Sequence, residues 1–234
     1  MLWLNGGPGA SSLCAGLLFE NGPCSISSDC NTTIHNPYSW NEKVNIIYLD
    51  QPIGTGFSYA SDGSSVSTLA DLSTDVYAFL QVFLQRFPQY AANPFHIAAE
   101  SWGGHYAPYI GSHIFRRNKE SQNRPFPGQI YVKFASIMLG NGLTDPASQF
   151  ETIPGYMCGD APYPPYGHDS VRCRTLRSTN PSCIQAIRGC YRYPQSKTVC
   201  DAATAYCWSG QFLLALKGVV PLKAILGYIK RARY

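Results

Sequence analysis

The sequence predicts an α/β fold, in which a mostly parallel sheet has flanking helices, followed by a disulfide-rich, mainly helical insertion. Two observations lead to this prediction. Short apolar runs alternate with amphipathic helical patterns from the amino terminus to about residue 150. Beyond that point prolines cluster, strand-like patterning fades, and six of the nine cysteines occur between residues 158 and 207.

Four apolar runs are expected to form strands. They are residues 1–4, 44–50, 95–99 and 131–139. Continuous apolar runs bounded by turn residues are typical of strands that are buried in a parallel sheet. The first, second and fourth runs end in turns that contain glycine or proline.

Helices are expected between these strands. Residues 67–87 carry apolar side chains close to a 3.6-residue period, and Pro88 follows as a stop signal. Residues 104–117 and the short segment 11–19 are further helix candidates. Residues 21–40 are rich in Asn, Pro and Ser, and we expect them to form a loop.

The patterns divide the chain into three parts. Residues 1–150 form the core, residues 151–208 an insertion of mostly short helices, and residues 209–234 an apolar, basic tail. Pro221 and the tail lysines make a transmembrane helix a poor fit. A membrane-surface helix is one alternative for the tail, but we prefer to interpret it as non-native sequence from an error in the gene model.

The charge is concentrated at the carboxyl end. The formal net charge is +4, and no Asp or Glu follows Asp201, whereas five Lys and Arg residues do. Without those five, 13 basic residues face 14 acidic ones. A nucleic-acid-binding protein would spread a basic face over the domain, so we expect no nucleic-acid partner.

The cysteines favour disulfides over a metal site. The sequence contains neither a C-x-x-C pair nor histidines at zinc-binding spacing. Nine is an odd number, so we expect one thiol without a partner within the chain. Disulfides form in oxidising compartments.

A glycosylation sequon points to the same kind of compartment. Asn31-Thr32-Thr33 is the one usable sequon, because Pro181 follows Asn180. Met1 runs directly into an apolar strand, so no signal peptide is present. We therefore expect a secreted or vacuolar full-length protein, and a chain that lacks its front.

The sharpest chemical signal is the segment 99–104, Ala-Glu-Ser-Trp-Gly-Gly. It is a variant of the G-x-S-x-G nucleophile elbow, which lifts a serine on a tight turn between a strand and a helix. A strand is expected before Ser101 and a helix after it. The alternative is an ordinary turn in which Ser101 only caps the helix.

The second signal is the glycine-rich loop at residues 5–9, Asn-Gly-Gly-Pro-Gly. An acyl-transfer enzyme needs two backbone N–H groups aimed at the developing oxyanion. In elbow-containing hydrolases one donor follows the nucleophile and the other lies in the loop after an earlier strand. Here they would be Trp102 and Gly7. Alone, such a loop is also compatible with a simple tight turn.

Six motifs together resemble the serine carboxypeptidases, in particular the fungal secreted type. They are residues 3–9, 20–23, 36–40, 50–59, 100–106 and 140–146. The resemblance implies a partial α/β-hydrolase fold, truncated at both ends, with the insertion in place of the family's cap. It also implies peptides or proteins as substrates, and neither a cofactor nor a metal ion.

The resemblance implies roles for eight residues. Ser101 would be the nucleophile, and Gly7 and Trp102 would form the oxyanion hole, although the family usually has Tyr where Trp102 stands. Asn5, Gly6 and Glu100 match the site for the substrate's terminal carboxylate, with Trp3 and Glu20 in support. Two adjacent carboxyl groups share a proton at low pH and repel once both ionise, so peptide binding should weaken as pH rises.

The catalytic Asp and His are not identified in the chain. The order in this fold is Ser, Asp, His, yet His105 and His113 are expected on the helix behind the nucleophile, and His168 lies in the insertion. We therefore expect this chain to be inactive and poorly stable by itself. A serine carboxypeptidase-like acyltransferase and a non-catalytic binding module are alternative functions.

Overall fold

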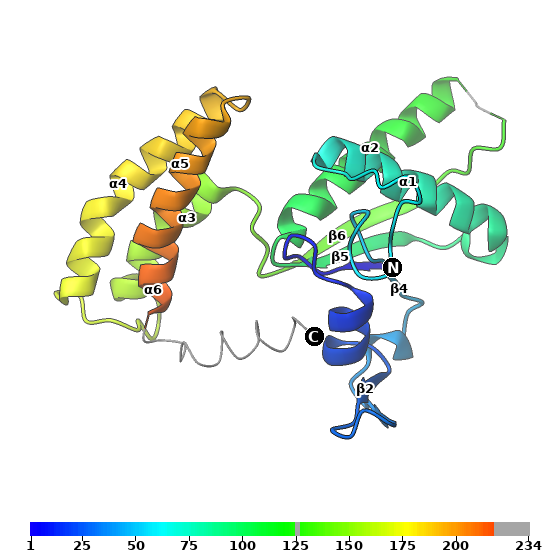
Figure 1. Ribbon diagram of the computed structural model, residues 1–234, viewed down its shortest axis with the longest axis horizontal. Coiled ribbons are helices and arrows are strands. Elements are labelled where there is room, and N and C mark those ends of the chain that lie inside the picture. The colour runs from blue at the N-terminus through cyan, green and yellow to red at the C-terminus, as the bar shows by residue number, and fades with distance from the viewer. Residues whose placement is uncertain (125–126, 218–234) are drawn as a thin grey trace. The chain divides into compact units, whose positions relative to one another are not determined.

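The computed structural model describes residues 1–124 and 127–217, and the chain divides into two units between Thr144 and Asp145. The first unit contains the sheet, and the second is helical. Of the tail expected at residues 209–234, positions 218–234 lie outside the described residues. Figure 1 shows the ribbon of both units.

The sheet of the first unit has four parallel strands in the order β4-β1-β5-β6. Their bounds are Leu2–Leu4 for β1, Ile47–Tyr48 for β4, Phe95–Glu100 for β5 and Phe134–Gly140 for β6. Each of the four apolar runs that the sequence predicted therefore contains a strand. In the central pair, Trp3 is in register with Ala98 and Leu4 with Ala99, so β1 and β5 end side by side.

The connections between the strands run in two opposite directions along the strand order of the sheet. The links β4–α1–β5 and β5–α2–β6 run the same way across the sheet, whereas β1–η1–β4 runs back. Because such crossovers are right-handed, α1 and α2 cover one face and the helical turn η1 (Leu13–Glu20) lies on the other (Figure 1). The direction changes between β1 and β5, and open parallel sheets bind ligands at the carboxyl ends of such strands.

The core of this unit lies between the sheet and the helices α1 (Leu69–Arg86) and α2 (Gly103–Asn123). Its fully buried Leu and Ile side chains are Leu2, Leu4, Leu80, Ile97, Ile110 and Ile114. Each such side chain contributes roughly 1.5–3 kcal/mol by leaving water. The Thr68 side chain caps α1 by accepting a hydrogen bond from the amide of Asp71, 3.1 Å away. The core also holds β5 and α2, the two elements that flank Ser101.

The segment that was expected to be a loop contains a β-hairpin, so that prediction was wrong in part. Strands β2 (Cys24–Ile26) and β3 (Thr33–His35) pair antiparallel. Each has three residues, which is too short for an alternating pattern to be recognised. The 3₁₀ turns η2 (Trp40–Glu42) and η3 (Pro88–Tyr90) complete the unit.

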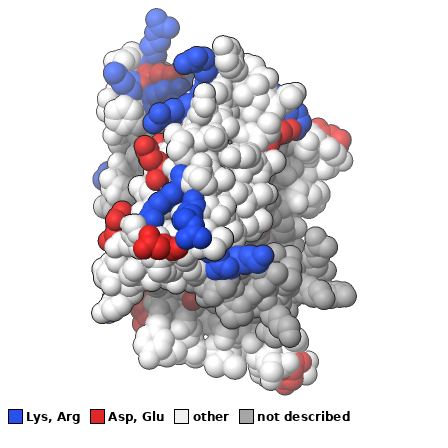
Figure 2. All heavy atoms as spheres, turned by 90° about the vertical axis from the view of Figure 1, so that its left-hand side faces the viewer, with Lys and Arg blue, Asp and Glu red and all other residues white. Residues whose placement is uncertain are grey.

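The second unit consists of helices. They are α3 (Pro146–Gly155), η4 (Tyr156–Asp160), α4 (Val171–Arg192), α5 (Lys197–Cys207), η5 (Trp208–Leu213) and α6 (Leu214–Leu216). On the face that Figure 2 shows, basic and acidic side chains are interspersed. Two of the exposed pairs are Lys197 with Asp201 and Arg188 with Glu151.

One helix of this unit is longer than expected. The sequence suggested short helices, but α4 has 22 residues and continues through Pro181. Gln211 of η5 is fully buried against this helix. Its amide nitrogen donates to the Leu176 carbonyl over 3.1 Å and to the Thr179 hydroxyl over 2.7 Å. These bonds support the turn before the proline.

The disulfides of the second unit are Cys158–Cys173, Cys183–Cys207 and Cys190–Cys200. The expected disulfide-rich helical region is therefore present. The odd count of cysteines suggested a single unpaired thiol, but Cys14, Cys24 and Cys30 are all free. Among the described residues, no helix combines the length and the apolar character that crossing a membrane requires.

Candidate active site

Ser101 stands on a sharp turn between β5 and α2. Its φ angle of +56° lies in the left-handed region, which costs a non-glycine residue roughly 1–2 kcal/mol. The surrounding backbone holds this conformation. The Ser101 amide donates to the Gly140 carbonyl over 3.0 Å, and the Ser101 carbonyl accepts from the amides of Gly104 and Leu143 over 3.0 and 2.8 Å. The side chain of Ser101 is exposed at the end of β5.

Small residues let the strand and the helix approach each other at this turn. A β-carbon on Gly103 would lie 2.6 Å from the Cβ of Ala99, and one on Gly104 would lie 2.6 Å from the Leu143 carbonyl oxygen. Real Cβ atoms do not come so close without displacing a neighbour. The glycines that suggested an elbow in the sequence are therefore required by its geometry.

The glycine-rich loop lies directly against this elbow. A β-carbon on Gly6 would be 2.3 Å from the Trp102 backbone nitrogen and 3.0 Å from the Cβ of Ser101. Gly7 follows with a φ angle of +110°, which glycine adopts readily. The Tyr106 hydroxyl accepts a hydrogen bond from the amide of Gly9 over 3.2 Å and ties the loop to α2.

Two amide donors in these segments are free. Within the described residues, neither the Gly7 nor the Trp102 amide donates a hydrogen bond. Gly7 is exposed and Trp102 is half-buried. Two unpaired N–H groups from touching segments, beside an exposed serine hydroxyl, are what stabilisation of an oxyanion requires. Their role at Ser101 stays a prediction.

Asn5 joins two carboxyl groups next to the elbow. Its side-chain amide donates to both oxygens of Glu20, over 3.1 and 2.9 Å, and to Glu100 over 3.3 Å. The indole N–H of Trp3 donates to the Asn5 carbonyl oxygen over 2.8 Å and orients the amide. Five of the predicted site residues, which are Trp3, Asn5, Gly6, Glu20 and Glu100, therefore come together in one place.

The electrostatics of this cluster favour a shared proton. Burial raises the pKa of Glu100, and the negative charge of Glu20 and a hydrogen bond to its carboxyl group raise it further. A protonated Glu100 can donate to Glu20, whereas two ionised carboxylates in contact repel. At acidic pH the cluster therefore carries less negative charge and can accept an anionic group.

Comparison with known proteins matches residues 1–209 to the serine carboxypeptidase family. The chain belongs to this family. Carboxypeptidase Y homolog A of Uncinocarpus reesii is 44% identical over 207 residues, which cover 88% of this chain and 35% of that protein. The Coccidioides posadasii and Talaromyces marneffei homologs are 42% and 43% identical over the same length. The chain thus spans about a third of the length of these curated relatives.

A solved structure supports the fold of this chain. The prohormone-processing carboxypeptidase Kex1(Δ)p from Saccharomyces cerevisiae matches with a TM-score of 0.65 and 24% identity. The match covers 88% of this chain and 44% of the yeast chain. At that identity the likeness shows the fold alone, which is the α/β-hydrolase fold that the motifs implied.

Asp50 is a residue of the carboxypeptidase chain that the sequence reasoning missed. It is buried at the end of β4, and its carboxylate accepts from the Ser11 hydroxyl over 2.7 Å, the Leu13 amide over 3.1 Å and the Phe57 amide over 3.0 Å. It thereby joins the glycine-rich loop to the turn after β4. An acid at the end of the apolar run at residues 44–50 was the available signal.

The contacts of three histidines do not involve the Ser101 hydroxyl. His105 stacks on the Trp102 ring with centroids 4.3 Å apart, and burial lowers its pKa. His113 packs on Tyr77 in the first unit, and His168 contacts Asp169 in the second. In the described part of the chain, no hydrogen bond joins a histidine to the Ser101 side chain.

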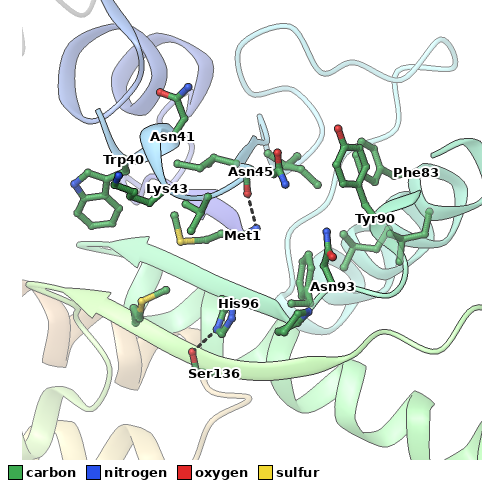
Figure 3. Close-up of a pocket in the computed structure, with 18 residues that line it drawn as sticks. Met1, Trp40, Asn41, Lys43, Asn45, Phe83, Tyr90, Asn93, His96 and Ser136 are labelled. Carbon is green, nitrogen blue, oxygen red and sulfur yellow. Dashed lines mark hydrogen bonds between the residues drawn. The ribbon is translucent and has the colours of Figure 1, made fainter. Parts of the chain in front are cut away.

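A cavity of about 1200 Å³ lies elsewhere in the first unit. Met1 and the start of β5, Phe95 and His96, line it together with Phe83 of α1 and Lys43 (Figure 3). Within its wall His96 and Ser136 are hydrogen-bonded over 2.8 Å. Parallel sheets bind ligands at the carboxyl ends of the strands, and Ser101 stands at that end of β5.

Proposed function

We propose that the full-length protein is a serine-type carboxypeptidase that removes C-terminal residues from peptides through an acyl-enzyme on Ser101. The observation that carries this proposal is the contact between the elbow and the glycine-rich loop. It brings two free amides and an exposed serine hydroxyl to the switch point of the sheet. Family membership supports the same reaction.

In the proposed reaction, the Ser101 oxygen attacks the carbonyl carbon of the last peptide bond. A C–O bond forms, and the carbonyl oxygen becomes an oxyanion that the Gly7 and Trp102 amides stabilise. The C–N bond then breaks, and the departing amine takes up the serine proton through a general base. Water hydrolyses the ester in a second step, which regenerates Ser101.

The general base would be a histidine that bonds to Ser101, and none of the described residues supplies that bond. A serine without a base is a weak nucleophile. We therefore propose that the 234 residues alone turn over peptide far more slowly than the full-length protein. Removing a member of such a triad costs several orders of magnitude in kcat.

The carboxyl cluster supports carboxypeptidase activity over acyl transfer to an alcohol. A peptide substrate ends in a carboxylate, and the Asn5 amide next to a protonated Glu100 offers donors to such a group. An alcohol acceptor has no charge for these donors to recognise. We propose Asn5, Gly6 and Glu100 as the carboxylate-binding residues, with Trp3 and Glu20 holding Asn5 in place.

The disulfides of the second unit support a proposal about the compartment. Three disulfides brace the second unit, and such bonds persist in secreted proteins and in compartments of the secretory route. We propose that the full-length protein is secreted or vacuolar and acts there on peptides or proteins.

A fluorophosphonate probe tests the nucleophile and the missing base together. We expect the full-length protein to label, the Ser101→Ala variant to lose the label, and an exposed control, Ser64→Ala, to retain it. The 234-residue chain should label at least 100-fold more slowly. Equal labelling of both chains would contradict the missing base, and labelling of Ser101→Ala would contradict the nucleophile.

The carboxylate site is tested by the pH dependence of KM. For a peptide with a free C-terminus, KM of the full-length protein should rise as the pH rises through the pKa of Glu100. The same peptide with an amidated C-terminus should show a weak dependence, because it brings no charge to the cluster. Parallel profiles for the two peptides would show that the cluster does not bind the terminal carboxylate.

A further inference from the structure

The loop at the tip of the hairpin, residues 27–32, is a well-ordered turn. The Ser27 amide donates to the Thr32 carbonyl over 3.0 Å, and the Thr32 amide donates to the Ser27 hydroxyl oxygen over 3.1 Å. Asp29 accepts a hydrogen bond from the Asn31 amide over 3.1 Å. Backbone groups and the side chains of Ser27 and Asp29 therefore hold the turn together.

Two side chains of this hairpin take no part in those bonds. Asn31 and Thr33 are exposed, and in the described part of the chain neither the Asn31 side-chain amide nor the Thr33 hydroxyl has a hydrogen-bond partner. Together with Thr32 they form an Asn-x-Thr sequon. We propose that Asn31 is a site of N-linked glycosylation, with a lipid-linked oligosaccharide as the donor.

The transfer balances without an external oxidant. The Asn31 side-chain nitrogen forms a bond to C1 of the first sugar, and the bond from C1 to the lipid pyrophosphate breaks. The amide loses one proton, and the lipid pyrophosphate leaves with the electron pair. The sequon supplies a side-chain amide and, two residues later, a hydroxyl. Neither group has a hydrogen-bond partner among the described residues of the hairpin.

A second Asn-x-Ser segment provides an internal contrast. Asn180 is followed by Pro181 and Ser182, inside helix α4. Its side-chain amide is buried and donates to the Phe150 carbonyl over 2.8 Å and to the Gln211 side-chain oxygen over 3.0 Å. Proline blocks this sequence, and the folded structure also hides its amide. The chain therefore contains one asparagine that is exposed to glycosylation, Asn31, and one that is buried, Asn180.

The disulfides independently support exposure to the compartment in which N-glycans are added. The bonds Cys158–Cys173, Cys183–Cys207 and Cys190–Cys200 require an oxidising lumen. N-glycans are surface modifications of proteins that pass through such a lumen. The two features come from different units of the chain.

A glycan on Asn31 would cover apolar surface. Asn31 lines an open hollow of about 540 Å³ together with Ile26, Cys30, Thr32 and Thr33. Ile26 is 39% exposed, and Ile34 on the neighbouring strand is 56% exposed. The hairpin extends away from the sheet (Figure 1), so a sugar at its tip shields these isoleucines. We expect the glycosylated chain to be more soluble than the unglycosylated one.

The test uses the chain fused to a secretion signal and translated with microsomes. We expect one endoglycosidase-sensitive mass increment on the protease-protected chain. Asn31→Gln and Thr33→Ala should each lose it, whereas Thr33→Ser retains the hydroxyl and should keep it in part. Asn180→Gln is the matched control and should keep the full increment. Thr32→Pro should abolish it by blocking the sequon.

Two results would overturn the proposal. One is a protease-protected chain that shows no endoglycosidase-sensitive increment, and the other is an Asn31→Gln chain that retains it. Variants that fold poorly still give a result. The mass increment is measured on all protease-protected chains, whether or not they reach the native fold.

Discussion

A β-carbon on Gly6 would lie 2.3 Å from the backbone nitrogen of Trp102 and 2.6 Å from the carbonyl oxygen of Glu100. Both atoms are backbone, so neither can rotate away as a side chain would. Gly6 therefore sets how closely the glycine-rich loop approaches the elbow. The spacing between the two proposed oxyanion donors depends on this one residue.

Gly6→Ala should separate the loop from the elbow. We expect a loss of roughly 1–3 kcal/mol in the free energy of unfolding, as overpacking usually costs. In the full-length protein the probe should react with Ser101 more slowly. Gly167→Ala is the control, because a β-carbon there meets no atom within 4 Å. Unchanged stability and labelling in Gly6→Ala would show that the two segments are not in contact.

The elements around Ser101 could be predicted because their signals are local. The runs at β1, β5 and β6 are mostly apolar, and Pro88 follows the end of α1 in the structure as the sequence predicted. The elbow and the glycine-rich loop were recognisable for the same reason. Each motif spans fewer than ten residues, and its small residues are required by its own backbone.

The contacts that could not be predicted join distant residues. Asp50 binds Ser11 and Leu13, which are 39 and 37 positions away, and no pattern in either segment indicates the other. The length of α4 was missed because Pro181 is a local stop signal, yet the helix continues through it. Gln211, 30 positions beyond the proline, packs its side chain on the preceding turn, and no local pattern indicates this contact.

Glu100→Gln should change how stability depends on pH. Because the pKa of Glu100 is raised in the folded state, its contribution is fully present below its unfolded pKa and is lost as pH rises through the folded value. The amide cannot ionise, so the variant should lose less stability than the parent between pH 4 and pH 7.

The gain at neutral pH should be below about 1 kcal/mol, because solvent screens this half-buried group. Thermal melts at several pH values measure it. The control is Glu42→Gln, at an exposed position on η2, which should leave the profile unchanged. If Glu100→Gln and the parent show the same pH profile, the repulsion between Glu20 and Glu100 is absent.

Two positions on α2 test where the core lies. Ile110 is fully buried, whereas Phe115 is 63% exposed on the same helix. Ile110→Ala should cost about 2–5 kcal/mol because it leaves a cavity, and Phe115→Ala should stay within about 0.5 kcal/mol of the parent. Chemical denaturation of the chain compares them. Similar losses at both positions would argue that the packing of α2 on the sheet is wrong.

The buried amides of the second unit should be energetically coupled. Gln211 donates to Thr179 over 2.7 Å, and its side-chain oxygen accepts from Asn180 over 3.0 Å. Removing either amide leaves the other with an unpaired buried group, which costs roughly 1–3 kcal/mol. Gln211→Ala and Asn180→Ala should therefore each destabilise the unit by about that amount.

The double variant should lose less than the sum of the two single losses, because the second change removes a group that the first has already left unpaired. Contacting residues in one network show interaction energies of about 0.5–3 kcal/mol. Chemical denaturation of the parent, the two single variants and the double variant completes this double-mutant cycle. Pairing Gln211→Ala with the distant Ile110→Ala gives the reference for additivity. If Gln211 and Asn180 prove as additive as that reference pair, the hydrogen bond between their side chains does not couple them in the folded unit.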